Sequence, residues 1–247
     1  EKGEYDAIVL SKAGIDALNL QHKISQEFTI DELIHCAGQG IIEIQCRQDD
    51  NEIRKLLENI NDQDAYLITG SPLSVRDHHS FSDDLYNFIR DCDLNKKPLI
   101  GSCFGHQAIA VALGGSVTKS EIKWNVGVEE TKFENFMPWM SPEKNLSLYV
   151  FHEDQVSLMP KGCKLLGSTQ NCKIASFSKG NHIFTTQAHP EFDYMFMKTI
   201  VEKYEEMLGP KIFKNAIDTL SNDVHGNTFS LWCENFIKFN LFSEERV

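Results

Sequence analysis

Residues 98–115 read PLIGSCFGHQAIAVALGG, and the fold of the whole chain can be argued outward from this stretch. An apolar run, a cysteine between glycines and a second apolar run indicate a buried strand, a sharp turn and a helix in immediate succession. Gly101 and Gly105 flank Cys103 in a G-x-C-x-G pattern, in which glycines relieve crowding as a strand reverses into a helix. The double glycine that closes the stretch is predicted to end that helix.

Cys103 is predicted to stand at the carboxyl edge of the sheet, at the N-terminus of a helix. Free backbone N–H groups and the positive end of the helix dipole point at a sulfur in this position and favour its thiolate form. Such a thiolate is a candidate nucleophile. A lone cysteine at a tight turn is also compatible with a small buried side chain, so the catalytic interpretation requires a base elsewhere in the chain.

A candidate base follows the last predicted strand, at 183–187. That strand runs into Ala188-His189-Pro190-Glu191, at the same edge of the sheet as the cysteine. An imidazole there can accept a proton from a thiol, and a carboxylate two residues later can fix its tautomer and orientation. The predicted catalytic residues are therefore Cys103 as nucleophile, His189 as base and Glu191 as the group that orients the base.

The pattern along the chain predicts an α/β fold with three layers: a mostly parallel open sheet with helices on both faces. In the first half, short apolar runs alternate with helical patterns, and such crossovers connect parallel strands. The second half contains short strand candidates typical of an antiparallel or mixed extension of the sheet. We expect a single domain over residues 1–247. Strands are predicted at 5–10, 41–44, 65–69, 98–100, 116–119, 126–133, 146–151, 163–168, 174–178 and 183–187.

The predicted helices carry apolar residues at helical spacing on one side. Ser82 is expected to cap the helix that precedes the central stretch. In the last helix, Leu231, Trp232, Phe236 and Phe239 form an apolar stripe that indicates core packing. Helices are predicted at 30–36, 53–60, 82–91, 104–113, 194–208, from about 210, and at 228–239.

Composition limits the possible partners. The chain has 24 Lys plus Arg against 36 Asp plus Glu, a net charge of −12, which disfavours nucleic acid and anionic membranes. Seven cysteines without a C-x-x-C pair indicate neither a disulfide framework nor a zinc site, and a reducing compartment is expected. No long apolar segment or secretory leader is apparent, so a cytoplasmic location is predicted.

Adjacent histidines at 78 and 79 invite a metal-binding interpretation. Neighbouring residues rarely hold one ion, and no carboxylate lies beside them at helical spacing, so a solvated loop is favoured. A metallohydrolase built from His78, His79, His152, Asp154 and His189 is the weaker alternative. We expect no metal and no cofactor.

The nucleophile and base segments together resemble the class I, triad-type glutamine amidotransferases, whose motifs read G-x-C-x-G-x-Q and H-P-E. The resemblance extends over residues 5–239 and implies a flavodoxin-like core. Three further segments are similar to free-standing members such as γ-glutamyl peptidases: TGSP at 69–72, FHEDQV at 151–156, and Trp232 with Asn235-Phe236.

The resemblance implies a role for each matching residue. Cys103 would attack a γ-glutamyl carbonyl and form a thioester, and the backbone N–H groups of Gly70 and Phe104 would form the oxyanion hole. Gln107 matches a substrate-contacting glutamine, although it could equally hold a loop.

A loop at 152–155 is expected to line the glutamyl pocket, with His152, Asp154 and Gln155 contacting substrate. His152 and Asp154 could instead form a structural hydrogen-bonded pair.

The expected partner is a small γ-glutamyl substrate, either glutamine or a glutathione-like peptide. Amidotransferase domains normally supply ammonia to a synthase. Because the domain is expected to fill the 247 residues, a synthase would be a separate protein chain. The remaining alternative is a catalytically silent binding or regulatory module with the same fold.

Overall fold

The computed structural model describes residues 65–241. Within this range, the secondary structure follows the predicted alternation closely. The strands predicted at 5–10 and 41–44 and the helices predicted at 30–36 and 53–60 lie outside the described residues.

A mixed sheet of seven strands forms the centre of the described region, in the order β1-β2-β9-β8-β7-β4-β5. The first three strands in this order are parallel, and the remaining neighbours are antiparallel. The α/β class is confirmed, and the antiparallel part is the extension expected from the second half of the sequence. The bounds are β1 Tyr66–Ile68, β2 Leu99–Ser102, β4 Asn125–Phe133, β5 Leu146–His152, β7 Cys163–Ser168, β8 Ser176–Lys179 and β9 Ile183–Thr186.

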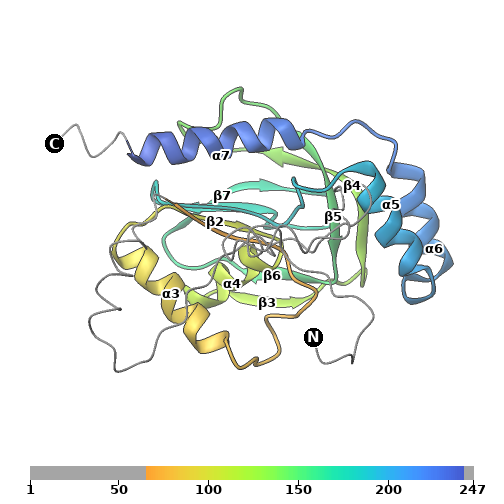
Figure 1. Cartoon of the computed structure of the whole chain (residues 1–247), viewed down its shortest axis with the longest axis horizontal. Helices are drawn as coiled ribbons and strands as arrows, with labels where there is room; N and C mark the ends of the chain where they lie inside the picture. The colour runs from red at the N-terminus through yellow and green to blue at the C-terminus, as the bar shows by residue number, and fades with distance from the viewer. Residues whose placement is uncertain (1–64, 242–247) are drawn as a thin grey trace, which may run out of the picture. The chain divides into compact units, whose positions relative to one another are not determined.

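Helices cover both faces of the sheet, with α3 and α4 on one side and α7 on the other (Figure 1). Successive side chains of a strand point to opposite faces, which explains the two layers. Leu99 and Ile183 belong to the apolar cluster under α3 and α4. Their neighbours Ile100 and Phe184 belong to the cluster under α7. The helices are α3 Ser82–Leu94, α4 Phe104–Ala112, α5 Tyr194–Lys203, α6 Glu205–Thr219 and α7 Gly226–Leu241.

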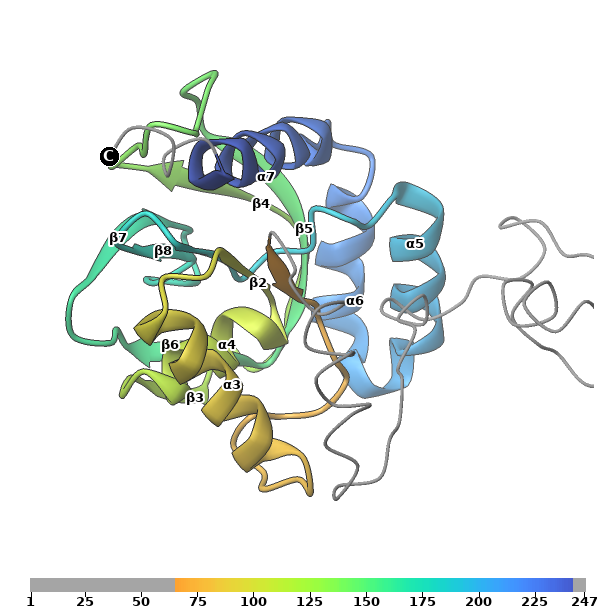
Figure 2. The same cartoon turned by 60° about the vertical axis from the view of Figure 1, so that its left-hand side comes forward.

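A third apolar cluster joins β4 and β5 to α5 and α6 and includes Tyr149, Met197 and Ala216. Figure 2 shows these two helices side by side next to the strands. The prediction of one helix over 194–208 was wrong, because α5 ends at Lys203 and α6 begins at Glu205. The predicted boundary near residue 210 coincides with a kink in α6, where Gly209 has a φ of 72°.

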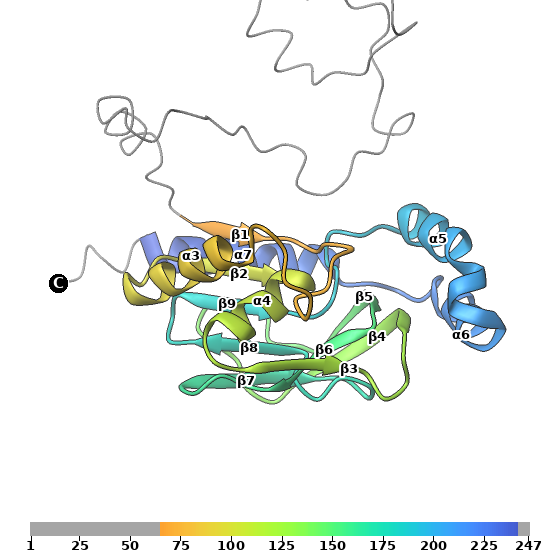
Figure 3. The ribbon, with the colours of Figure 1, turned by 90° about the horizontal axis from the view of Figure 1, so that it is seen from below.

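Three details of the sequence prediction need correction. Ser82 is the first residue of α3 and not its cap; Phe81 occupies that position. The loop predicted at 152–155 instead comprises the end of β5, one bend residue and the start of β6, which runs from Asp154 to Leu158 and pairs with β3 (Figure 3). Leu231 is 41% exposed, whereas the other members of its predicted stripe pack in or against the core.

The second, two-stranded sheet consists of β3 (Ser116–Lys119) and β6. An alternating strand of five residues is a weak local signal. The pairing with β3 is antiparallel, and it places the start of β6 opposite Lys119. The start of β6 is thereby held close to the end of β5.

Candidate active site

The strand, turn and helix predicted for the central stretch are all present. Cys103 stands between β2 and α4 with a φ of 47° and a ψ of −101°. A positive φ is uncommon for a residue with a side chain and requires support from its surroundings. The Cys103 N–H donates to the carbonyl of Thr186 at 2.9 Å, which ties the turn to the end of β9. The side chain is buried.

The two glycines of the motif are required by close packing around the turn. A Cβ atom at Gly105 would lie 2.0 Å from the carbonyl oxygen of Ile68. At Gly101 it would lie 2.6 Å from Cδ1 of Ile109 and 2.8 Å from the Gly105 carbonyl carbon. Neither position can accept a larger residue without movement of the backbone or of α4. This close approach seats the start of α4 directly against β1 and β2.

His189 follows β9 and is held on several sides. Its N–H donates to the carbonyl of Tyr149 at 2.8 Å, and its ring stacks on Phe192 with centroids 4.1 Å apart. Nδ1 lies 2.8 Å from Oε1 of Glu191. An ionised carboxylate can only accept, so Nδ1 carries a proton and Nε2 is the nitrogen available for proton transfer.

The imidazole and the thiol form an electrostatic pair. Burial by itself lowers the pKa of His189. The charge of Cys103 and hydrogen bonds with Cys103 and Glu191 act in the opposite direction and outweigh burial, so the net effect raises the pKa. A raised pKa favours the imidazolium form of His189 beside the sulfur of Cys103.

Gly70, two residues after β1, lies against both of these side chains. A Cβ atom at Gly70 would be 2.6 Å from Cε1 of His189 and 3.6 Å from Cβ of Cys103. Phe104 is the first residue of α4, where backbone N–H groups have no intrahelical acceptor. The predicted oxyanion donors therefore flank the cysteine, although their role in catalysis remains a prediction.

Comparison with known proteins places this chain in a family. A family model described as "Glutamine amidotransferase class-I" matches residues 28–201. The chain belongs to the class I glutamine amidotransferase family. A glutamine amidotransferase-like protein of Schizosaccharomyces pombe is 30% identical over 174 residues, which cover 67% of this chain and 68% of that protein.

Other relatives are named either as γ-glutamyl peptidases or as GMP synthases. Gamma-glutamyl peptidase 3 of Arabidopsis thaliana is 27% identical, over 73% of this chain and 76% of its own length. A chain of the glutamine-hydrolysing GMP synthase of Sulfurisphaera tokodaii is 29% identical, over 66% of this chain and 80% of its own. A solved glutamine amidotransferase from Methylobacillus flagellatus has the same fold, with a TM-score of 0.61 at 22% identity over 74% of this chain and 78% of its own.

Asp154, which was predicted to contact substrate, is bound to the loop that follows β1. Its carboxylate accepts hydrogen bonds from the hydroxyl of Ser74 and from Nη1 of Arg76, the latter at 3.3 Å. Its side chain is thus engaged with the same loop that begins at Gly70. This arrangement indicates that Asp154 positions the loop, and direct contact with substrate remains a prediction.

Gln107 and His152 meet at the backbone carbonyl of Asp154. Gln107 Nε2 donates to this oxygen at 2.7 Å, and His152 Nδ1 lies 3.0 Å from it. His152 and Asp154 are thus hydrogen-bonded, as the structural alternative predicted, but through the backbone and not through the carboxylate. Burial lowers the pKa of His152 to about 4, so its ring is neutral near pH 7. The substrate contacts predicted for these residues remain predictions.

Gln155 has an acceptor that the described part of the chain leaves without a partner. Its Oε1 is buried, and residues 65–241 provide no hydrogen-bond donor for it. A buried unsatisfied carbonyl is costly, and a ligand N–H group would relieve the cost. Gln155 therefore remains a candidate for contact with substrate.

One residue that lies beside Cys103 was not predicted from the sequence to belong to the site. Gln187 is buried, and its Nε2 lies 3.7 Å from the Sγ of Cys103. It is the last residue of the strand predicted at 183–187 and stands two positions before His189. A polar side chain at the carboxyl end of a buried strand, next to the predicted base, is the signal that could have identified it.

The histidines considered for a metal site are dispersed. His79 stacks on Phe81 and its Nε2 bonds the carbonyl of Ser74 at 2.9 Å, whereas the side chain of His78 is largely exposed. Across residues 65–241, no three His, Cys, Asp or Glu side chains are grouped so as to hold a metal ion. No helix in the same range is long and apolar enough to cross a membrane.

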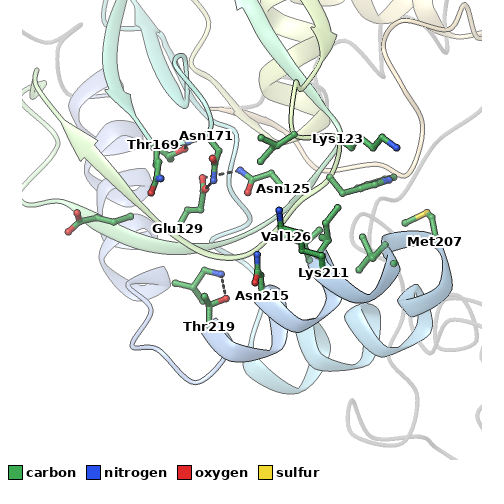
Figure 4. Close-up of a pocket in the computed structure, with 18 of the residues that line it drawn as sticks. Lys123, Asn125, Val126, Glu129, Thr169, Asn171, Met207, Lys211, Asn215 and Thr219 are labelled. Carbon is green, nitrogen blue, oxygen red and sulfur yellow. Dashed lines mark hydrogen bonds between the residues drawn. The ribbon is translucent and has the colours of Figure 1, made fainter.

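A cavity of about 1260 Å³ lies between β4, the segment after β7 and α6. Figure 4 shows Asn125, Glu129 and Asn171 together on one side of it, opposite α6. Asn125 Nδ2 donates to Oε2 of Glu129 at 2.9 Å and lies 3.3 Å from Nε2 of His152. Asn125 thus lines the cavity and also contacts a predicted substrate-binding residue.

Proposed function

We propose that this chain cleaves γ-glutamyl amide bonds through a γ-glutamyl thioester on Cys103. One observation carries the proposal: a buried cysteine at a strained strand-to-helix turn stands beside a histidine whose Nδ1 is 2.8 Å from Glu191. The choice of a γ-glutamyl acyl group is supported by the names of the relatives, which include γ-glutamyl peptidases and a glutamine-hydrolysing GMP synthase.

The acylation step uses the thiolate and imidazolium together. Sγ of Cys103 attacks the γ-carbonyl carbon, and the oxyanion that forms accepts hydrogen bonds from the N–H groups of Gly70 and Phe104. Each such donor contributes about 2.7 to 4 kcal/mol in comparable sites. His189 then gives its Nε2 proton to the nitrogen, the C–N bond breaks, and ammonia or an amine leaves.

Hydrolysis of the thioester reverses these roles. His189, now neutral, removes a proton from water, and the resulting hydroxide attacks the thioester carbon. The C–S bond breaks, glutamate leaves, and the thiolate and imidazolium are restored. Glu191 keeps the imidazole in one tautomer and orientation throughout both steps.

Two leaving groups are compatible with this chemistry. A peptide or amino acid would make the protein a stand-alone γ-glutamyl peptidase or transferase acting on glutathione-like substrates. Ammonia from glutamine would make it a glutaminase that supplies a separate synthase. The similarity to the GMP synthase chain of Sulfurisphaera tokodaii is in keeping with this candidate, and the similarity to gamma-glutamyl peptidase 3 is in keeping with the first. The silent-module alternative predicts binding of a γ-glutamyl compound without turnover.

Glutamate release from glutamine and from glutathione distinguishes these functions. We expect the purified protein to release glutamate from at least one of the two substrates, and Cys103→Ala to abolish release. Cys163→Ala is the matched control, because burial raises the pKa of the Cys163 thiol to about 11 and the residue lies in β7. Equal turnover by wild type and Cys103→Ala would overturn the proposed mechanism.

A further inference from the structure

Gln187 makes a side-chain contact with the sulfur of Cys103 that the proposed mechanism does not use. The side chain is 1% exposed, and its Nε2 lies 3.7 Å from Sγ, within the range of a hydrogen bond to sulfur. An amide presents both donors and an acceptor, so the consequence of this contact depends on which end of the amide faces the sulfur.

The neighbouring groups decide that orientation. The carbonyl oxygen of Asp154 can only accept, so the amide nitrogen of Gln107, 2.7 Å away, must face it. The second N–H of Gln107 donates to Oε1 of Gln187 at 3.2 Å. With its oxygen engaged in this way, Gln187 turns its NH₂ group toward the sulfur.

The same carbonyl oxygen of Asp154 is contacted by a second buried group. His152 carries its proton on Nδ1, since that nitrogen faces the Asp154 carbonyl at 3.0 Å. Its Nε2 then accepts from Nδ2 of Asn125 at 3.3 Å. The Asp154 carbonyl is therefore surrounded by donors, and a flipped Gln107 amide would place two oxygens in contact.

We propose that Gln187 is a further catalytic residue, whose amide donates a hydrogen bond to the sulfur of Cys103, and that Gln107 acts as its positioning residue. A hydrogen bond to the charged form of a group stabilises that form, so this contact favours thiolate over thiol. The proposal rests on the proposed function only for its effect on turnover. Its effect on the reactivity of the sulfur is independent of the substrate.

The proposal is tested by measuring how fast iodoacetamide alkylates Cys103 in the absence of substrate. Only the thiolate form of a cysteine reacts with this reagent. Peptide mass spectrometry follows Cys103 separately from the other cysteines across a range of pH. In Gln187→Leu we expect alkylation at neutral pH to slow roughly tenfold, and its half-maximal pH to move upward, because a charge-assisted hydrogen bond is lost. Gln170→Leu, an exposed glutamine after β7, is the matched control and should react like wild type.

Gln187→Glu is a second variant, which tests whether the effect of Gln187→Leu comes from a packing defect. Glutamate has nearly the same shape as glutamine, but as a carboxylate it offers no donor and adds negative charge beside the sulfur. We expect it to slow alkylation at least as much as Gln187→Leu. Wild-type alkylation profiles in both folded variants, verified by thermal unfolding, would overturn the assignment.

Gln107→Glu separates a positioning role from direct contact with substrate. A carboxylate at 107 cannot donate to the Asp154 carbonyl or to Gln187, so the amide at 187 loses the group that orients it. We expect slower alkylation of Cys103 in the absence of any substrate. If Gln107 acted only by binding substrate, alkylation would be unchanged and only KM would rise, which would overturn its positioning role.

Turnover provides a separate readout. If the proposed function holds, kcat/KM of Gln187→Leu should fall together with the alkylation rate, by roughly tenfold. If the wild-type protein shows no turnover with any γ-glutamyl substrate, the proposed function fails. The alkylation profiles still decide the role of Gln187 in that case.

Discussion

Gly70 brings backbone close to the side chains of Cys103 and His189 because it has no side chain of its own. A Cβ atom there would lie 2.6 Å from Cε1 of His189, so Gly70→Ala must displace the imidazole. A displacement of about 1 Å in a catalytic group can cost roughly 100-fold in rate, and we expect a loss of this order in glutamate release.

The control for Gly70→Ala is Gly114→Ala, at the end of α4. No atom lies within 4 Å of the added methyl group there, although the φ of 92° imposes some strain. We expect this variant to keep its activity and to lose thermal stability only through the strain of this backbone conformation, about 1–2 kcal/mol. Full activity in Gly70→Ala would contradict the close packing of Gly70 against His189.

Gly105 is required for a different reason, because its neighbour is rigid backbone. Gly105→Ala would place a methyl group 2.0 Å from the carbonyl oxygen of Ile68. The strand and the helix must then separate, and we expect about 1–3 kcal/mol lower stability in urea unfolding, as is typical of overpacked cores. At Gly162 a methyl group would approach only the flexible end of Lys179 at 3.9 Å, so Gly162→Ala should carry the strain of its φ of 82° without forcing two elements apart.

At the scale of elements, β6 anchors the loop that carries Gly70. Asp154→Ala removes the acceptor for Ser74 and Arg76, so we expect faster backbone hydrogen exchange over residues 70–76 and several-fold lower activity. Arg76→Gln should have a smaller effect in the same direction, because the arginine side chain is 40% exposed and its ion pair is screened.

Glu153→Gln is the matched control for the anchor at Asp154. Glu153 is the adjacent residue and forms an ion pair with Lys119 at 2.8 Å, away from the loop at 70–76. We expect unchanged exchange and activity in this variant. If Asp154→Ala raised KM without changing exchange over residues 70–76, Asp154 would contact substrate and would not act as an anchor.

Helix α7 packs on the face of the sheet opposite α4. Trp232 is fully buried, packs edge-on against Phe133 with ring centroids 5.1 Å apart, and donates from Nε1 to the carbonyl of Pro142 at 3.2 Å. We expect Trp232→Ala to lower the free energy of unfolding by about 3–5 kcal/mol. Leu231→Ala, at the neighbouring exposed position, should change it by about 0.5 kcal/mol or less.

At the scale of the whole molecule, two buried neutral histidines make stability depend on pH. Burial lowers the pKa of His106 to about 3 and that of His152 to about 4. In the unfolded chain both histidines have a pKa of about 6.5. Below that pH the unfolded state binds more protons than the folded state, so acid favours unfolding, by up to about 1.4 kcal/mol per pH unit for each histidine.

Urea unfolding between about pH 7 and about pH 4.5 tests this dependence. Over this range the free energy of unfolding should fall steadily as the pH is lowered below about 6.5. His106→Asn should show a smaller slope over the same range, even if it is less stable at neutral pH. Parallel slopes for the two proteins would show that His106 does not contribute.

Much of the fold and part of the site could be predicted from local patterns. Apolar residues at every second position indicated strands, and apolar residues three or four positions apart indicated helices. These spacings identified most elements between residues 65 and 241, because both reflect which face of an element is buried. The G-x-C-x-G pattern indicated the turn at Cys103, since only glycine fits where strand and helix approach so closely. Leu231 was misassigned because apolar spacing alone does not show how wide the buried face of a helix is.

The sequence alone determined the alternation of strands and helices, the turn at Cys103 and the neighbouring pair His189 and Glu191, because each depends on residues close together in the chain. Only the tertiary structure decided that Gln187 faces the sulfur and that Asp154 binds the loop after β1. The first contact joins residues that are 84 positions apart in the sequence, and the second joins residues that are 80 positions apart. They depend on the order and register of the packed strands, which no local pattern contains.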